Sequence, residues 1–403
     1  DGKFLLWRLS SSDVVDFACS QYEGDRPRVK FDQLGKFFLK LPPRLEQTRI
    51  VQKLEELLSG LDAGVAELKA AQKKLVQFRQ SVLKAAMDGS LTATWRAGQA
   101  ALPEHARNAE TGEQFLKRIL EARRAQMEAI QREKFVERGK SLPSGWQGKY
   151  LEPLAPAIDN SLPEGWAQAT LEQLTEFITS GSRGWAEYYA SAGAIFIRSQ
   201  NINTDMLDLS DAAFVNPPRS SEGARTLVNR NDLLLTITGA NVGKAALVEA
   251  ELSEAYVSQH VALIRPVESA LSNFLHLFLT SGTGGRKQLN EEAYGAGKPG
   301  LNLQQLGAVV VPVPPPQELL EMLKYIRIHF ESHDDQLKAI ECALKQSVAQ
   351  RRNLLKAAFN GQLVPQDASD EPASVLLERI RFERAARASQ SRERRTHVRK
   401  IAA

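Results

Sequence analysis

The sequence predicts an α+β protein in which a β-rich domain is joined to two long helices that pair as an antiparallel coiled coil in a pseudo-twofold repeat. The first observation is that "RQSVLKAAMDGSL" (79–91) returns as "RRNLLKAAFNGQL" (351–363) at a gap-free offset of 272. The second is that apolar residues upstream of each copy recur at spacings of three, four or seven, as in paired helices. The third is that short strand-like runs lie between the copies.

The first long helix is expected within residues 42–99, which we assign as the first spacer segment. Pro42-Pro43 precede it and Asp88-Gly89 follow it, the usual placement of Pro before a helix and of Gly after one. A helix of some 40 residues is about 60 Å long. Its apolar stripe contains the pairing residues Leu54, Leu61, Leu68 and Leu83.

The second long helix is expected within residues 313–364, the second spacer segment, because Pro314-Pro315 and Asn360-Gly361 bracket it in the same way. Its pairing residues are Phe330, Leu337, Leu344 and Leu355. Core helices of two unrelated bundles would carry similar stripes. Repeated sequence implies related environments, however, and this favours an antiparallel pair.

A β-rich domain is expected at residues 162–312, between the spacers. The runs "GAIFIR" (193–198), "DLLLTI" (232–237) and "HVALIR" (260–265) are short, apolar and bounded by Gly, Asn and Pro, as strands are.

Three segments complete the domain assignment. Residues 1–41 are expected to be the end of an earlier β-rich domain, because "KFLLWRL" (3–9) resembles "NFLHLFL" (273–279) at nearly the repeat offset. By the same offset, about 110 residues of that domain would precede Asp1. Residues 100–161 are expected to form a charged, helical linker, and residues 365–403 a short helix with a basic tail.

Composition narrows the class of protein. The 403 residues are 43% hydrophobic and 25% charged, which is typical of a globular protein of two or three domains. No apolar run approaches the roughly 18 residues of a membrane span. Two cysteines in separate segments suit a reducing compartment, and we expect the cytoplasm.

No complete catalytic motif is present. In "TGANVGKAA" (238–246) three residues separate the glycines and Ala follows Lys, whereas a phosphate-binding loop has four and then Ser or Thr. In "VNPPR" (215–219) Arg stands where an amino-methylating enzyme has a base-stacking aromatic residue. Six histidines and two cysteines do not cluster at ligand spacing. We therefore expect no catalytic residue, no metal site and no cofactor in this chain.

Candidate DNA contacts are polar or aromatic side chains in glycine- and asparagine-rich segments beside the predicted strands. Arg pairs with guanine, Asn and Gln pair with adenine, and Lys contacts phosphate. The candidates are Arg183, Trp185, Arg198, Gln200, Asn201, Asn241, Lys244, Gln259, His260 and Lys298. Alternatives remain open: a core position for the aromatics, a plain β-turn for 238–244, and a structural role for the histidine.

The charge balance favours a rival hypothesis. Over 162–312 there are ten Lys or Arg and fifteen Asp or Glu, so a DNA-binding domain would have to segregate its charges. We expect the acids of 205–211 and 249–254 to lie apart from the candidate cations. The rival is a non-catalytic coiled-coil adaptor whose β domain binds protein.

The arrangement of a β-rich domain, then "PP…EQ…IV…LEELL…FRQSVLKAAMDGSL", and then the same unit again after "LPEGW" (162–166), resembles the specificity subunit of type I DNA restriction–modification systems. This resemblance covers nearly the whole chain. A second "LPSGW" at 142–146 departs from the family pattern by lengthening the linker.

The resemblance implies a function. Each target-recognition domain would read one half of a bipartite site in double-stranded DNA, and the helices would set the spacing and dock methyltransferase subunits. Methylation and cleavage would be performed by those subunits and by restriction/translocase subunits, which use S-adenosylmethionine, ATP and Mg. The chain itself would be non-catalytic.

Overall fold

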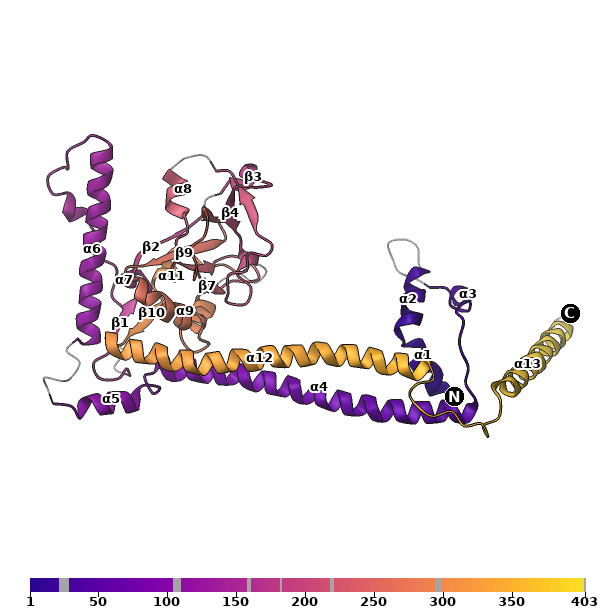
Figure 1. The fold of residues 1–403 in the computed structure, drawn as a ribbon. Coiled ribbons are helices and arrows are strands. Elements are labelled where there is room, and N and C mark those ends of the chain that lie inside the picture. The colour runs from indigo at the N-terminus through magenta and orange to yellow at the C-terminus, as the bar shows by residue number, and fades with distance from the viewer. Residues whose placement is uncertain are drawn as a thin grey trace. The chain divides into compact units, whose positions relative to one another are not determined.

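The computed structural model describes residues 1–21, 29–103, 110–157, 161–181, 183–217, 221–293 and 299–401 (Figure 1). The chain divides into two compact units. Unit 1 contains Asp1–Leu75 and Asp334–Ala403, and unit 2 contains Val76–His333. The long helices α4 (Arg44–Met87) and α12 (Pro316–Phe359) contribute to both units.

All the regular secondary structure in the described part of unit 1 is helical. Besides its portions of α4 and α12 it contains α1 (Gly2–Leu9), α2 (Ser12–Ser20), α3 (Phe31–Leu34) and α13 (Ala373–Ile401). The segment 3–9, expected to match 273–279, is helical, and so is its counterpart α9 (Ser272–Thr280). That residues 1–41 end an earlier recognition domain stays a prediction.

The long helices pair antiparallel, as the apolar stripes predicted. In unit 1, Asp62 on α4 forms an ion pair with Arg351 on α12, and Leu54 shares a core cluster with Leu355. In unit 2, the ring of Phe78 lies 4.4 Å from that of His333. Position numbers rise on one helix as they fall on the other, which defines the antiparallel direction.

The pairing residues fall into two groups by burial. Four are buried, namely Leu54, Leu83, Phe330 and Leu355. The other four, Leu61, Leu68, Leu337 and Leu344, are half-buried.

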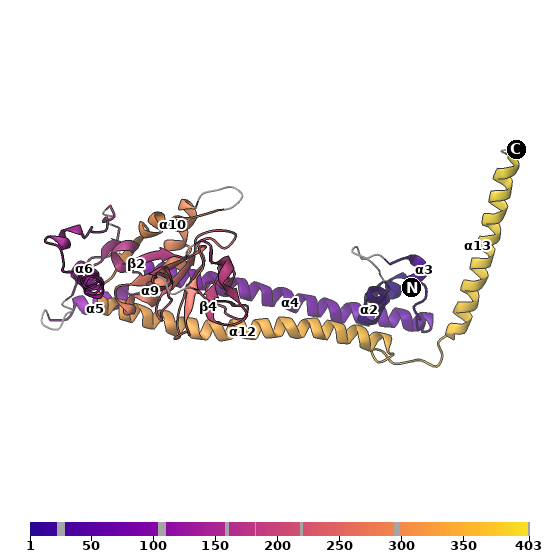
Figure 2. The ribbon, with the colours of Figure 1, turned by 90° about the horizontal axis from the view of Figure 1, so that it is seen from above.

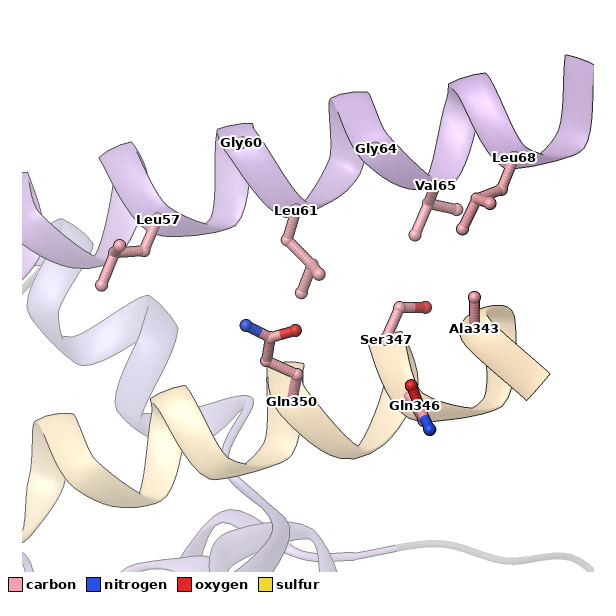
Figure 3. Close-up of a pocket in the computed structure, with 10 residues that line it drawn as sticks. All are labelled: Leu57, Gly60, Leu61, Gly64, Val65, Leu68, Ala343, Gln346, Ser347 and Gln350. Carbon is pink, nitrogen blue, oxygen red and sulfur yellow. The ribbon is translucent and has the colours of Figure 1, made fainter. Parts of the chain in front are cut away.

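Figure 3 shows why part of the seam is less tightly packed. Along this stretch of unit 1 the two helices face each other across a cavity of about 440 Å³. Leu61 points toward Gln350 and Val65 toward Ser347, while Gly60 and Gly64 contribute no side chain. Small and polar residues therefore leave open a space that larger apolar ones would fill.

Each long helix ends at the predicted glycine. Gly89 and Gly361, one repeat apart, have φ of +75° and +74°. This left-handed conformation ends helices and is accessible to glycine without a Cβ clash. At Gly89 a Cβ would also lie 2.4 Å from Cγ of Pro163. Both the backbone conformation and this close contact therefore require glycine at position 89.

A buried carboxylate ties the start of α12 to residues of unit 2 that precede β1. Glu318 accepts hydrogen bonds from Oγ1 of Thr92 at 2.6 Å and from Nε1 of Trp166 at 3.0 Å, and it pairs with Arg96. Three donors offset the cost of removing this charge from water.

Unit 2 holds two four-stranded sheets and a two-stranded clasp. The first sheet has the order β2–β9–β6–β7, all antiparallel; the second has the order β3–β5–β4–β8, in which β4 and β8 are parallel; β1 pairs with β10. The strands are β1 (Ala167–Thr170), β2 (Thr175–Ser180), β3 (Tyr189–Ala190), β4 (Ala194–Ile197), β5 (Ala213–Val215), β6 (Leu233–Thr236), β7 (Ala245–Leu247), β8 (Ala255–Val257), β9 (Val261–Pro266) and β10 (Val310–Val313). The three predicted strand runs are thus confirmed as β4, β6 and β9.

Unit 2 also contains several shorter helices. They are α5 (Ala93–Ala100), α6 (Gly112–Glu137), α7 (Leu171–Leu174), α8 (Ser221–Thr226), α9, α10 (Gly285–Glu292) and α11 (Leu303–Gly307), with short 3-10 turns at Trp146–Lys149, Trp185–Tyr188, Ser199–Asn201 and Ser269–Leu271. Helix α9 packs on β7 and on α10 (Figure 2).

The expected linker 100–161 contains the 26-residue helix α6, which packs on the β domain. Its buried residues Phe115, Ile119 and Arg123 face β1, β2 and β10, and Nε of Arg123 donates to the carbonyl of Thr175 at 2.8 Å. Within the part of the chain that is described, no helix is long and apolar enough to cross a membrane.

Candidate nucleic-acid interface

The strand topology brings several loops to one edge of the β domain. Ser180 at the end of β2 pairs with Ala262, and Thr236 at the end of β6 pairs with Val261, so both strands end where β9 begins. In the second sheet, the parallel strands β4 and β8 end together at Ile197 and Val257. The residues leaving these ends, 181, 183–184, 198–212, 237–244 and 258–260, are called the loop edge below.

Close backbone contacts join the two sheets at this edge. The amide of Ser258 donates to the carbonyl of Ile197 at 2.9 Å. A Cβ on Gly181 would lie 2.0 Å from the carbonyl oxygen of Val257, so β2 and β8 approach more closely than any other residue would allow. Seven of the ten predicted DNA contacts therefore lie exposed or half-buried on one edge: Arg183, Arg198, Gln200, Asn241, Lys244, Gln259 and His260.

Arg198 and Gln200 converge on one acidic residue. Nη2 of Arg198 donates to the backbone carbonyl of Asp211 at 2.7 Å and lies 3.6 Å from its Oδ2. Nε2 of Gln200 donates to the same Oδ2 at 2.9 Å. Both side chains are thereby held in defined positions without being withdrawn from the surface.

Asn201 is a correction to the predicted contacts. It is buried, and its Oδ1 accepts from the amide of Arg198 at 3.0 Å while its Nδ2 donates to the carbonyls of Asp208 and Asp211 at 2.9 and 3.3 Å. An amide with both ends satisfied internally shapes the loop and is not available to a base.

The segment 237–244 is a turn between β6 and β7. The amides of Val242, Gly243 and Lys244 donate to carbonyls of Gly239, Thr236 and Asn241, so these N–H groups are already used within the turn. This favours the β-turn over a phosphate cradle. Asn241 extends from it, and its Nδ2 donates to the carbonyl of Ser199 at 3.3 Å, which links this turn to the loop of Arg198.

Lys244 lies beside an acid from another loop. Its Nζ is 3.9 Å from Oδ2 of Asp205, whose Oδ1 accepts from Nη2 of Arg286 at 2.5 Å and from the amide of Ala245 at 3.1 Å. The expected separation of acids from cations is therefore wrong: Asp205 and Asp211 both contact candidate cations at the loop edge.

Three further candidates flank these loops. Arg183 is exposed, with no hydrogen bond or ion pair among the described residues. Gln259 is exposed, and its Nε2 lies 3.2 Å from Nε2 of His260, which is half-buried. All three side chains are available to a ligand.

Trp185 is a second correction, because it is a core residue. It is 5% exposed, stacks on Phe196 with ring centroids 5.8 Å apart and meets Tyr256 edge-on at 5.3 Å. A glycine-bounded aromatic segment has the same composition whether its rings face solvent or the core, and burial of so large an apolar surface is favoured. Lys298 and Arg219 lie outside the described residues.

The structure adds three residues that sequence reasoning missed: Asp205, Arg286 and His276. Nε2 of His276 lies 3.0 Å from the carbonyl of Asp205 and 3.2 Å from that of Ala245, so this nitrogen carries the proton. Burial lowers the pKa of His276 below its ordinary 6.5, because the charged form loses its hydration. A lone His in the apolar run "NFLHLFL" was the one sequence signal for this cluster.

No group of three or more His, Cys, Asp or Glu suited to a metal ion occurs within the described ranges. The side chains at the loop edge offer guanidinium, amide and ammonium groups as hydrogen-bond donors.

Residues 163–348 match the model of the family described as the type I restriction modification DNA specificity domain. Two curated relatives are the specificity subunits of the type I restriction enzymes EcoBI from Escherichia coli and EcoKI from Escherichia coli strain K12. The chain is 26% identical to the first over 357 residues and 24% identical to the second over 361 residues. Each comparison covers 86% of this chain but 65% or 64% of the relative, so the chain spans just under two thirds of their length.

A chain in a solved structure of a type I R-M system has a similar fold. The TM-score is 0.57 at 16% identity, over 89% of this chain and 71% of that one. At this identity the likeness concerns the fold alone.

Proposed function

We propose that this chain is the DNA-recognition component of a type I restriction–modification complex, and its similarity to the specificity subunits of such systems supports the proposal. Its β domain reads one half of a bipartite site in double-stranded DNA through the loop edge. The observation that carries this proposal is the convergence of donors from separate loops, above all Arg198, Gln200, Asn241 and Lys244, at one edge of two sheets.

The chemistry of these side chains suits two different roles, base reading and phosphate contact. An arginine or an amide can make paired hydrogen bonds to a base edge, whereas a lysine acts as a point charge on phosphate. Gln200 and Arg198 are held by Asp211 and suit base reading; Lys244 at the surface suits the backbone.

We further propose that the chain is non-catalytic and acts in the cytoplasm with methyltransferase and restriction/translocase subunits, which would supply the sites for S-adenosylmethionine, ATP and Mg. The paired helices α4 and α12 would dock the methyltransferase subunits and set the distance to a second reader. Residues 1–41 would belong to that second reader, and 42–99 and 313–364 would be the two spacers.

The test is a binding selection. The full chain, assembled with its methyltransferase subunits, is used to recover duplexes from a random-sequence library, and the recovered duplex is then titrated over a salt series. We expect a defined half-site and an affinity that falls with salt. Recovery of no preferred sequence, with binding to protein partners intact, would support the adaptor instead.

Matched variants separate the two kinds of contact. Gln200→Ala is compared with Gln304→Ala, an exposed glutamine on α11, and Lys244→Ala with Lys287→Ala on α10. Gln200→Ala is expected to relax preference at one base pair, and Lys244→Ala to weaken all duplexes alike and to flatten the salt slope by about one unit. The two controls should leave both quantities unchanged.

A further inference from the structure

Asp211 accepts hydrogen bonds from Gln200 and Arg198, the two side chains that are best placed to read bases. Its Oδ2 accepts from Nε2 of Gln200 at 2.9 Å and lies 3.6 Å from Nη2 of Arg198. The Asp211 side chain is 85% exposed and that of Arg198 only 25%, so the carboxylate faces solvent while the guanidinium is held beneath it.

Two features keep the Arg198 guanidinium in place. Nη2 also donates to the backbone carbonyl of Asp211 at 2.7 Å, a contact that does not involve the carboxylate. Asn201 anchors the same loop through the carbonyls of Asp208 and Asp211. Movement of the Asp211 carboxylate alone would therefore free donors without rearranging the loop.

The oxygens of a carboxylate resemble the acceptors that a base presents in the major groove, such as N7 and O6 of guanine. Unlike a base, the carboxylate is also negatively charged and repels phosphate. A duplex that offers suitable acceptors can replace the carboxylate at Gln200 and Arg198. A duplex without them leaves the pairing intact, so that these donors stay occupied, and its phosphates meet the exposed carboxylate of Asp211.

On the premise of the proposed function, we propose that Asp211 is a specificity-determining residue of the loop edge. In the free chain it holds Gln200 and Arg198 as a surrogate acceptor, and on DNA it penalises sequences that cannot replace it. Its contribution is to lower affinity for the wrong sequence more than to raise affinity for the right one.

The test compares Asp211→Asn with Asp208→Asn in the full chain assembled with its methyltransferase subunits. Both variants remove one negative charge from the same loop. The side chain of Asp208 accepts from the amide of Ser210 at 2.9 Å and touches neither Gln200 nor Arg198, so Asp208→Asn measures the effect of charge alone. The probes are the duplex recovered by selection and a scrambled duplex of equal length.

We expect Asp211→Asn to raise affinity for the scrambled duplex about three- to tenfold and to steepen its salt slope by about one unit, because one repulsive charge is lost. Affinity for the selected duplex should rise less, so that the ratio between the two falls. In a Gln200→Ala background the effect on this ratio should shrink, because the two residues act as a pair.

The measured quantity is the ratio of affinity for the selected duplex to affinity for the scrambled duplex. If this ratio is equal in Asp211→Asn and Asp208→Asn while the wild-type complex still discriminates, the role of Asp211 is overturned and the proposed function stands. Absence of discrimination in the wild-type complex would instead overturn the proposed function. A ratio that equals the wild-type value in both variants would also contradict the inference about Asp211.

Discussion

The two copies of the repeated helix junction share an apolar core but differ in their polar contacts. In unit 1 the core contains Leu54, Leu58 and Leu355; in unit 2 the residues one repeat away, Ile326, Phe330 and Leu83, are buried in the same way. The apolar positions therefore carry the geometry that both copies need.

The buried polar residues of the two junctions differ from each other. In unit 2, Glu318 is buried among Thr92, Arg96 and Trp166. Glu46, one repeat earlier, is buried in unit 1. There the positions equivalent to Thr92 and Arg96 are occupied by Val364 and Ala368. Unit 1 instead pairs Arg49 with Asp370 at 2.6 Å. The repeat therefore preserves the packing of the helices, while each junction has its own set of buried polar contacts, which we call its polar clamp.

The largest expected effect tests the clamp. Glu318→Ala should destabilise unit 2 by about 3–5 kcal/mol, because it leaves a buried indole N–H, a hydroxyl and a guanidinium without their acceptor. Glu46→Ala should cost less, since the described residues give its carboxylate no comparable set of donors. Hydrogen exchange of each unit's amides measures the two losses separately, and equal losses would contradict the distinction.

The next effect tests the shared core. Leu54→Ala and Ile326→Ala should each destabilise their own unit by about 2–5 kcal/mol, because both leave a cavity in a buried cluster. Leu61→Ala should cost clearly less, because Leu61 is half-buried and already lines an open cavity. Denaturant titration of the three variants gives the order; a loss at Leu61 as large as that at Leu54 would mean that the cavity is closed in solution.

A smaller effect distinguishes two neighbours at the loop edge. Asn201→Ala should lower stability by about 1–3 kcal/mol, because buried carbonyls of the loop lose their donor. Gln200→Ala, at the surface, should change stability by less than about 0.5 kcal/mol. Thermal unfolding of both variants checks this. Were Gln200→Ala the more destabilising of the two, Asn201 would regain its place among the DNA contacts.

The smallest effect is a pH dependence. The pKa of His276 is lower in the folded chain than its ordinary 6.5, so the folded state binds fewer protons. The stability that this provides is fully present above 6.5 and is lost as the pH falls below it, by at most about 1.4 kcal/mol per pH unit for one proton. His276→Gln should flatten the loss measured by unfolding between neutral and mildly acidic pH; an unchanged slope would exclude His276 as its source.

Local rules made the helices and strands predictable from sequence. Proline before a helix and glycine after it act through their own backbone, so Gly89 and Gly361 could be identified without knowledge of the fold. Strand runs such as 232–237 are recognisable for the same reason.

The candidate site was less predictable, because its properties depend on residues distant in sequence. Asp205 and Arg286 are 81 positions apart and form one ion pair, and no local pattern reveals it. Asn201 and Gln200 are adjacent polar residues, yet one is buried and the other exposed. Trp185 lies in the core although its glycine-bounded segment also suited a ligand surface, because tertiary packing decides between the two positions.

The pairing of β1 with β10 has a further consequence. Ala167 lies opposite Val313, so the chain enters the β domain and leaves it toward α12 at points about 5 Å apart. Gly112 at the start of α6 closes this junction, because a Cβ there would lie 2.3 Å from the carbonyl of Val313. Insertions, deletions or wholesale divergence between these strands cannot change the separation of the two points of attachment. The β domain between these two strands can therefore diverge in sequence without moving its point of attachment to α12.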